Sequence, residues 1–547
     1  MEEVISLINN KKFNEALQKL KNFDQDKKNN IEYIHILTVV LLELKNFNEA
    51  EKNLKRLRNL NSNNPEWDLL EGNIFFHQKK ISLAIEKYLL VIVKNPRNIM
   101  ANLNLSVCYK EQKKYSLCIK YLKKIIKINP KLYISYFHIG LILLENNFYN
   151  LSIKFFNLAI KFNKDDLEIY TNKAIALKKK FDYIEALKIY NLVLKNNNFD
   201  QQALLNRGIL FHEMKMFDKA IFDFKNLISL NPKNKEVYFA LANTQLMTRD
   251  YKNGLANYEK RWLRKDSDQY RYKNTKRIQS IKQLNDCNIL IWSEQGYGDT
   301  IQYSRFIRVL KKFNCKIFFE VQKDLRDYFS KQFECNVSDN FKFCEKFCDY
   351  EIPLLSIPYL LDIETNNIPL SNKYLSVNVN DVSIFKDKLN IQKNNLNIGL
   401  ALSGNPKYQS NSQRSIKLEK IYEKIKLYNC YMIQKDFIKS DLDFMRTNNI
   451  KNTSNLINNF EDTANIIQSM DLIICVDTSI AHLAGALGKK TILLLHHNPE
   501  PRWLCSGNKS IWYDSIYILR QQKILEWSFP LSQLNKIIDS LTSKEKN

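Results

Sequence analysis

The stretch Ile289–Phe306 combines residue types that let a protein backbone approach a ligand closely. It opens with the apolar run ILIW, short enough to be one buried strand, and breaks at Gly296 and Gly298. A helix is predicted to start at Asp299 and Thr300. Glycine permits positive φ and close approach, and the N–H groups at a helix start bind anions, so this turn is a candidate ligand site. An ordinary tight strand-to-helix connection has the same pattern, and both interpretations stay open at this point.

A second strand, turn and helix start is encoded by DLIICVDTSIAHLAGALGKK. Asp477 and Thr478 close its apolar strand and stand where a helix N-cap belongs. The N–H groups near Ser479 and Ile480 would then point, with the helix dipole, at an anion, which is a common way to hold a diphosphate without a metal. His482 falls one turn into the helix, where it either contacts the bound ligand or donates to a backbone carbonyl.

Two cations follow a third predicted strand, in NIGLALSGNPKYQSNSQR. After a turn at 404–406 come Lys407 and Arg414, whose positive charges could screen a diphosphate. Each could equally be a solvated loop charge.

These three loops lie in a second half where short apolar runs alternate with amphipathic helices, which predicts parallel sheets covered by helices. The expected strands are Lys316–Val321, Asn397–Leu402, Cys430–Gln434, Asp471–Val476 and Thr491–Leu495, and the expected helices are Thr300–Phe313, Leu418–Leu427, Phe460–Met470 and Ser479–Leu487. We expect two Rossmann-like units at 283–395 and 396–547, preceded by a connector at 269–282.

The first half, 1–268, repeats with a period of 34 residues. Small residues recur in two series, followed by helix-ending prolines: Thr38, Gly72, Ser106, Gly140, Ala174, Gly208 and Ala242; then Ala16, Ala50, Ala84, Cys118, Ser152, Ala186, Ala220 and Gly254; then Pro96, Pro130 and Pro232. This pattern resembles the tetratricopeptide repeat and predicts an all-α superhelix of antiparallel helix pairs. The concave face of such an array binds a peptide or a protein, unless the array only positions the second half or mediates self-association.

Composition limits the class of protein. A chain of 547 residues exceeds one core, and its net charge of +25 comes from scattered lysines, so we do not expect a nucleic-acid partner. The ten cysteines lack the paired CxxC of a zinc site, which favours free thiols in a reducing compartment. The N-terminus MEEVISLINNKK lacks a signal-peptide core, and no apolar run could span a bilayer. We expect a cytoplasmic protein, at most peripheral at the inner membrane.

Four motifs resemble, in the same order, those of bacterial tetratricopeptide-repeat glycosyltransferases, whose catalytic half is similar to the ADP-heptose:lipopolysaccharide heptosyltransferases. They are EQGYGDTIQYSRF, LALSGNPKYQSNSQRSI, DLIICVDTSIAHLAGALGKKT, and PRWL to WYDSIYILRQ. The resemblance covers essentially the whole chain and implies a metal-independent enzyme of GT-B fold, with the acceptor on the first unit and the sugar nucleotide mainly on the second. It implies that Asp299 is the base and that Asp477 and Thr478 form the diphosphate loop. Ser479 stands where heptosyltransferases usually have glycine, which leaves the donor sugar open.

The expected function is transfer of a sugar from a nucleotide-diphosphate donor to a hydroxyl group on a protein or glycan precursor, with no metal or cofactor. Around the proposed base, the acceptor-side or loop residues are Glu294, Gln295, Gly296, Gly298 and Thr300. Glu294 is the rival base unless it braces the loop, and Asp299 could simply cap its helix. The alternative is a non-catalytic repeat scaffold with a degenerate transferase domain. A dinucleotide oxidoreductase is disfavoured, because no third glycine follows at the required spacing.

Overall fold

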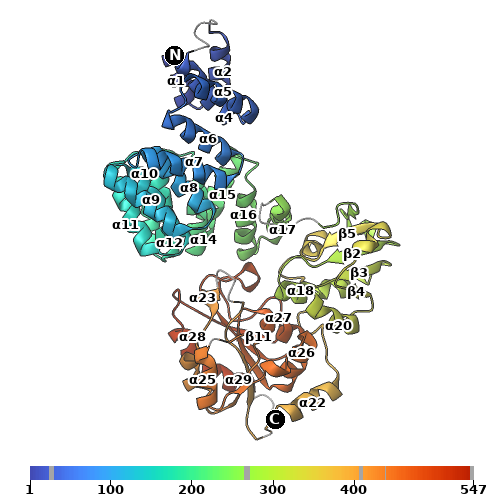
Figure 1. Ribbon diagram of the computed structural model, residues 1–547. Coiled ribbons are helices and arrows are strands. Elements are labelled where there is room, and N and C mark those ends of the chain that lie inside the picture. Colours follow the sequence, from blue (N-terminus) through green and yellow to red (C-terminus); the bar gives the residue numbers. More distant parts are fainter. Residues whose placement is uncertain (24–29, 264–270, 393, 406–410, 438, 543–547) are drawn as a thin grey trace. The chain divides into compact units, whose positions relative to one another are not determined.

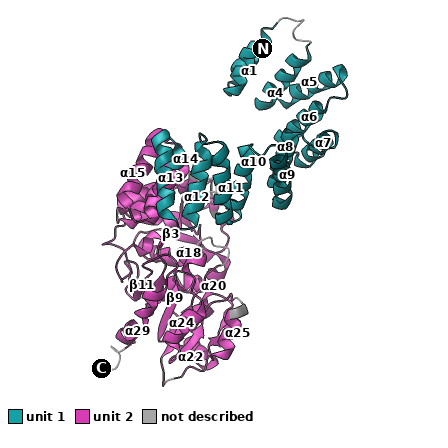
Figure 2. Cartoon of the chain, turned by 90° about the vertical axis from the view of Figure 1, so that its left-hand side faces the viewer, with its two compact units in different colours: residues 1–203 teal, residues 204–547 magenta. Residues whose placement is uncertain are grey.

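The structure is a computed structural model that describes residues 1–23, 30–263, 271–392, 394–405, 411–437 and 439–542. The chain forms two compact units, residues 1–203 and 204–547 (Figure 2). The division falls inside the repeats, so the last repeat helices belong to the same compact unit as the sheets. The domain limits drawn from the sequence remain predictions.

The first half is a series of helix pairs, as predicted (Figure 1). Its helices are α1 (Glu2–Asn9), α2 (Phe13–Lys21), α4 (Ile31–Glu43), α5 (Phe47–Leu60), α6 (Pro65–His77), α7 (Ile81–Lys94), α8 (Ile99–Glu111), α9 (Tyr115–Ile128), α10 (Tyr133–Glu145), α11 (Tyr149–Phe162), α12 (Leu167–Lys179), α13 (Tyr183–Asn196), α14 (Gln201–Glu213), α15 (Phe217–Leu230), α16 (Lys235–Met247) and α17 (Tyr251–Tyr258). The 3₁₀ helix η1 (Glu259–Leu263) follows α17 directly.

The small residues of the repeat lie where an aromatic ring of the paired helix meets the backbone. A Cβ added to Gly140 would lie 2.6 Å from Cε1 of Phe156, and one added to Gly208 would lie 2.5 Å from Cε1 of Phe224. Both rings are fully buried. Glycine is therefore required for the close approach of the two helices, which outweighs its cost of about 1 kcal/mol in a helix interior.

The turn inside each helix pair contains a residue in the left-handed region, although it is never glycine. These residues also recur every 34 positions, with φ between 57° and 67°: Lys11, Lys45, Lys79, Lys113, Asn147, Phe181, Lys215 and Arg249. The 34-residue period thus extends to the backbone conformation of the turns.

The second half contains two parallel sheets, as the alternating pattern predicted. The first has five strands in the order β1-β5-β2-β3-β4 and the second has six in the order β11-β10-β9-β6-β7-β8. The strands are β1 (Lys276–Arg277), β2 (Asn288–Trp292), β3 (Lys316–Glu320), β4 (Asn336–Ser338), β5 (Tyr350–Pro353), β6 (Asn397–Ala401), β7 (Asn429–Met432), β8 (Lys451–Asn452), β9 (Leu472–Val476), β10 (Thr491–Leu495) and β11 (Ile516–Arg520).

Helices connect and cover these strands. They are η2 (Ile281–Leu284), α18 (Tyr297–Tyr303), α19 (Arg305–Leu310), α20 (Lys323–Gln332), η3 (Lys342–Lys346), η4 (Leu354–Ser356), α21 (Ile357–Leu360), α22 (Val379–Lys388), α23 (Asn411–Arg414), α24 (Leu418–Ile425), α25 (Lys439–Thr447), η5 (Ser454–Leu456), α26 (Phe460–Ser469), α27 (Ser479–Ala486), η6 (Pro501–Trp503), α28 (Ser528–Ser532) and α29 (Leu534–Thr542). No helix within the described ranges is long and apolar enough to cross a membrane.

The helix predicted at Thr300–Phe313 begins three residues earlier, at Tyr297, and is divided into α18 and α19. Helix α18 begins at Tyr297 with Gly296 as its N-cap, because the N–H of Gly296 donates to Oδ2 of Asp299 at 3.1 Å and Asp299 thus occupies the third helical position. Of the two properties that glycine permits, positive φ is not used here, since neither Gly296 nor Gly298 adopts it. Close approach to another part of the chain is the remaining reason for a glycine here.

Candidate functional site

The starts of helices α18 and α27 meet, although they follow strands of different sheets. A Cβ added to Gly298 would lie 2.8 Å from Cδ2 of His482 and 3.6 Å from Cα of Ser479. Any side chain at residue 298 would therefore separate the two helix starts. The loop with Gly298 and Asp299 and the loop with Asp477 and Thr478, both identified from the sequence, thus lie side by side.

Asp299 acts both as a helix cap and as an ion-pair partner. Its Oδ2 accepts the Gly296 N–H, and its Oδ1 accepts from Nη2 of Arg502 at 2.5 Å. The two paired side chains are each about 15% exposed. Arg502 also donates to Oε1 of Gln302 and pairs with Glu500 at 2.6 Å. The carboxylate of the loop after β2, in the first sheet, therefore faces a cation that follows β10, in the second sheet.

Arg502 was not among the site residues predicted from the sequence. Burial would lower the pKa of its guanidinium, but the charges of Glu500 and Asp299 raise that pKa well above its usual value, so Arg502 remains charged. Burial raises the pKa of the Asp477 carboxyl, and the Arg502 charge opposes this shift. Arg502 lies in the quoted motif PRWL, which was the available signal, but nothing in the sequence indicated that it would reach Asp299.

The second loop presents the open start of helix α27. Thr478 is the N-cap, yet its side chain makes no capping hydrogen bond and its buried Oγ1 has no partner. Ser479 and Ile480 are the first two helical residues, whose N–H groups have no acceptor within the helix. The Ala481 N–H differs, because it donates to the Thr478 carbonyl at 3.0 Å.

His482 is buried one turn into α27. Its Nδ1 lies 3.0 Å from the hydroxyl of Tyr513, not next to a backbone carbonyl, and its ring stacks on Trp503 with centroids 5.3 Å apart. Burial, followed by the charges of Arg502 and Arg305, lowers the pKa of His482 well below its usual value. The imidazole is thus neutral and part of the wall behind Gly298.

Arg414 approaches the second loop from α23, which follows strand β6. Its Nη1 donates to the Asp477 carbonyl at 2.6 Å, and its guanidinium occupies the space that a Cβ on Gly404 would fill. Arg414 therefore lies at the end of strand β9, beside the predicted diphosphate loop. The other predicted cation, Lys407, lies outside the described residues.

The remaining first-loop residues contact the end of the repeats or the loop itself. Glu294 is buried in an ion pair with Arg261, and Gln295 donates to the Tyr258 hydroxyl at 2.9 Å. Thr300 is buried, with Oγ1 3.4 Å from the Gly296 carbonyl oxygen. The structure thus separates Glu294 from Asp299 and favours the bracing interpretation of Glu294.

A row of polar side chains at the carboxyl ends of β9, β10 and β11 was not predicted. Thr478, His496 and Gln521 continue the register of these three parallel strands, so they lie side by side. Like the Thr478 hydroxyl, Nδ1 of His496 and Nε2 of Gln521 are buried without a partner. Burial, then the Arg414 charge, lowers the pKa of His496 to about 4. The signal in the sequence was a polar residue within two positions of the end of each apolar run.

Comparisons with known proteins identify two regions. Residues 457–513 match the model of glycosyltransferase family 9 (heptosyltransferase), and residues 101–132 and 201–234 match the tetratricopeptide repeat. The first match includes α26, β9, α27, β10 and η6, and therefore the second loop and Arg502. No match was found among curated proteins.

Solved structures also resemble the chain. A tetratricopeptide repeat protein from Parabacteroides merdae is 17% identical over 42% of this chain and 91% of its own, with a TM-score of 0.37. The C-terminal part of a repeat-containing protein from Cytophaga hutchinsonii is 17% identical over 44% of this chain and 98% of its own, with a TM-score of 0.34. YrrB, a repeat protein with an unusual peptide-binding site, is 15% identical over 33% and 94%, with a TM-score of 0.28.

The fold and the matched regions define a repeat protein joined to an α/β module of two parallel sheets. Together the family matches support a tetratricopeptide-repeat glycosyltransferase, in which residues 457–513 are similar to family 9.

Proposed function

We propose that this protein transfers a sugar from a nucleotide-diphosphate donor to a hydroxyl acceptor, without a metal ion. The observation that carries the proposal is the meeting of the two loops at Gly298, which brings the Asp299 carboxylate to the start of α27. In the proposed reaction, Asp299 takes the proton of the acceptor hydroxyl as its oxygen attacks the anomeric carbon. The bond from that carbon to the diphosphate breaks, and the nucleoside diphosphate leaves.

The proposed donor site is the start of α27. Thr478 supplies an unpartnered hydroxyl there, and Ser479 and Ile480 supply the first N–H groups of the helix. The helix dipole and the nearby Arg414 and Arg502 favour a negatively charged group at this position. Five groups can therefore share the charge of the diphosphate, which is the basis for proposing that no metal and no further cofactor are needed.

The base is tested by Asp299→Asn in the full chain. Asparagine keeps the shape of the side chain and can still accept the Gly296 N–H, but it cannot take up a proton as a carboxylate does. We expect nucleoside diphosphate release, measured across a panel of sugar nucleotides and acceptors, to fall about 10²–10⁴-fold with donor binding retained. Turnover at the wild-type level would exclude Asp299 as the base, and no turnover by the wild-type protein with any donor would favour the non-catalytic scaffold.

The repeats are proposed to bind a protein or peptide, either a partner or the acceptor itself. Tetratricopeptide helix pairs present an extended surface, which is the support for this part of the proposal. The test compares the full-length chain with a chain that lacks residues 1–203. If the full-length chain transfers sugar to a protein, and the shortened chain only hydrolyses the donor, the repeats bind the acceptor.

A further inference from the structure

The last repeat is built into the core of the transferase half. Tyr251 and Leu255 of α17 belong to the same buried apolar cluster as side chains of both sheets. Helix α16 contacts η6, which carries Arg502, and α17 contacts α21, which follows strand β5 of the first sheet. The end of the repeat array therefore touches both halves of the α/β module.

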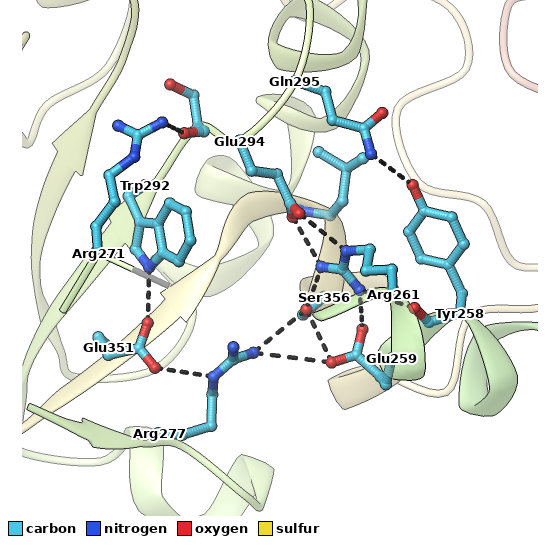
Figure 3. Close-up of polar contacts among 12 residues, drawn as sticks. Tyr258, Glu259, Arg261, Arg271, Arg277, Trp292, Glu294, Gln295, Glu351 and Ser356 are labelled. Atoms are coloured by element: carbon cyan, nitrogen blue, oxygen red, sulfur yellow. Dashed lines mark hydrogen bonds and ion pairs between the residues drawn. The ribbon is translucent and has the colours of Figure 1, made fainter. Parts of the chain in front are cut away.

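Arg261, directly after the last repeat helix, forms a two-pronged ion pair with Glu294 (Figure 3). Nε and Nη2 of Arg261 donate to the two carboxylate oxygens of Glu294, both at 2.8 Å. Each residue is only 4% exposed. A fork of this kind fixes the direction of the carboxylate as well as its distance.

Every N–H of the Arg261 guanidinium has an acceptor. Besides Glu294, Nη1 donates to the Tyr258 carbonyl at 3.2 Å and to Glu259 at 2.7 Å, and Nη2 donates to Ser356 at 2.7 Å. A guanidinium has five N–H donors, and all five are used. Glu294 in turn accepts the Leu355 N–H at 3.2 Å. Neither charge could turn away without leaving buried polar groups unpaired.

The fork acts at the beginning of the loop that carries Asp299. Glu294 lies two residues after strand β2. Gln295 is also held, because its side-chain amide donates to the Tyr258 hydroxyl and its backbone carbonyl accepts from Gln322 at 2.8 Å. Gly296, the N-cap of α18, follows immediately. Asp299 is the third residue of that helix, so the direction of residues 294 and 295 sets the place of its carboxylate.

We propose that Arg261 is a positioning residue, which holds the 294–299 loop through Glu294 so that the last repeat completes the active site. Arg261 itself touches no reacting atom; it acts through Glu294 on Asp299. Its role in turnover rests on the function proposed above, whereas its role in ordering the loop does not.

The test uses the full chain with Arg261→Lys and Glu294→Gln. Lysine keeps the charge but cannot form the fork, and glutamine keeps the shape but removes the charge. In hydrogen exchange without ligand, we expect the amides of 296–300 to exchange about tenfold faster in both variants, while β9 and α27 keep wild-type rates. The double variant should add little to either single change, because both remove the same interaction.

Arg277→Lys is the matched control. Arg277 forms its shortest ion pair with the fully buried Glu351, at 2.8 Å, and that glutamate holds Trp292 rather than the loop. Arg277 meets the partners of Arg261 only at longer range, Ser356 at 3.4 Å and Glu259 at 3.7 Å. Figure 3 shows the two arginine–glutamate pairs side by side. The control should leave exchange at 296–300 unchanged.

Turnover gives a second readout. With the sugar nucleotide that the wild-type protein uses best, we expect kcat to fall about 10–100-fold in Arg261→Lys while KM for the donor stays within about twofold, since the donor site lies on α27. Unchanged exchange at 296–300 would overturn the proposal, as would faster exchange with wild-type kcat. If the wild-type protein released no nucleoside diphosphate at all, the proposed function would fail, and the exchange result alone would decide whether Arg261 orders the loop.

Discussion

Replacing Gly298 with alanine would test the contact between the two helix starts. Gly298 lies in a helix at negative φ, so alanine alone would stabilise the protein by about 0.4–1 kcal/mol through the unfolded state. The added Cβ, however, would lie 2.8 Å from Cδ2 of His482, closer than the 3.0 Å that real Cβ contacts keep. His482 is buried, and its ring is held by Tyr513 and Trp503. Overpacking costs about 1–3 kcal/mol, so we expect a net loss of roughly 1–2 kcal/mol.

Urea unfolding followed by tryptophan fluorescence can measure this loss. Five of the six tryptophans lie after residue 203, so the signal reports mainly on the unit that contains the site. Gly296→Ala is the control, because its Cβ would contact only Oδ2 of Asp299, at an ordinary 3.4 Å. His482→Ala provides the decisive background, since it removes the ring that alanine 298 would strike.

In the His482→Ala background, Gly298→Ala should cost nothing or stabilise slightly. The same loss in both backgrounds would refute the reasoning, because the cost would then not come from the imidazole. A Gly298→Ala protein as stable as the wild type would refute the contact between the helices altogether.

Three further outcomes are expected. Gly140→Leu should cost at least about 1–3 kcal/mol by driving a side chain into the Phe156 ring, seen as a lower Tm; unfolding at the wild-type temperature would contradict the packing. Thr478→Val should weaken donor binding more than acceptor binding in calorimetry, and a chelator should leave wild-type turnover intact; magnesium-restored activity would oppose this. Because the pKa of His496 is lowered to about 4 in the folded protein, the unfolded chain takes up this proton first as the pH drops. The free energy of unfolding should therefore fall by up to about 3 kcal/mol between about pH 6.5 and about pH 4. His496→Gln should flatten this slope in urea titrations, and an unchanged slope would contradict the reasoning.

The repeats could be predicted from the sequence because their contacts are local and periodic. Gly140 meets Phe156 only 16 positions away, and the same pair of positions recurs in the next repeats, so the spacing of small residues records the packing. The strands β3, β6, β7, β9 and β10 were predicted for a similar reason, since each is one short apolar run. Short strands such as β1 and β8 carry too few residues for any pattern.

The candidate site was predicted only as separate parts. The loops at Gly298 and Asp477 were found from glycines and cap residues, which are local signals. Their meeting depends on how two sheets pack, and Arg502 reaches Asp299 from 203 positions away, at a distance no local pattern records. The start of α18 was misplaced because the Asp299 carboxylate resembles an N-cap in sequence, whereas in the structure it bonds back to Gly296 from the third position.

The sharing of a core between α17 and the sheets limits how the gene can change in length. A repeat inserted or deleted between α16 and residue 283 would displace Tyr251, Leu255 and Arg261 from the contacts that they make with the sheets and with Glu294. A repeat gained or lost ahead of residue 204 leaves those contacts intact, because each repeat depends mainly on its neighbours. The array is therefore fixed to the sheets at its C-terminal end, and repeats ahead of residue 204 can be gained or lost without rebuilding the α/β module.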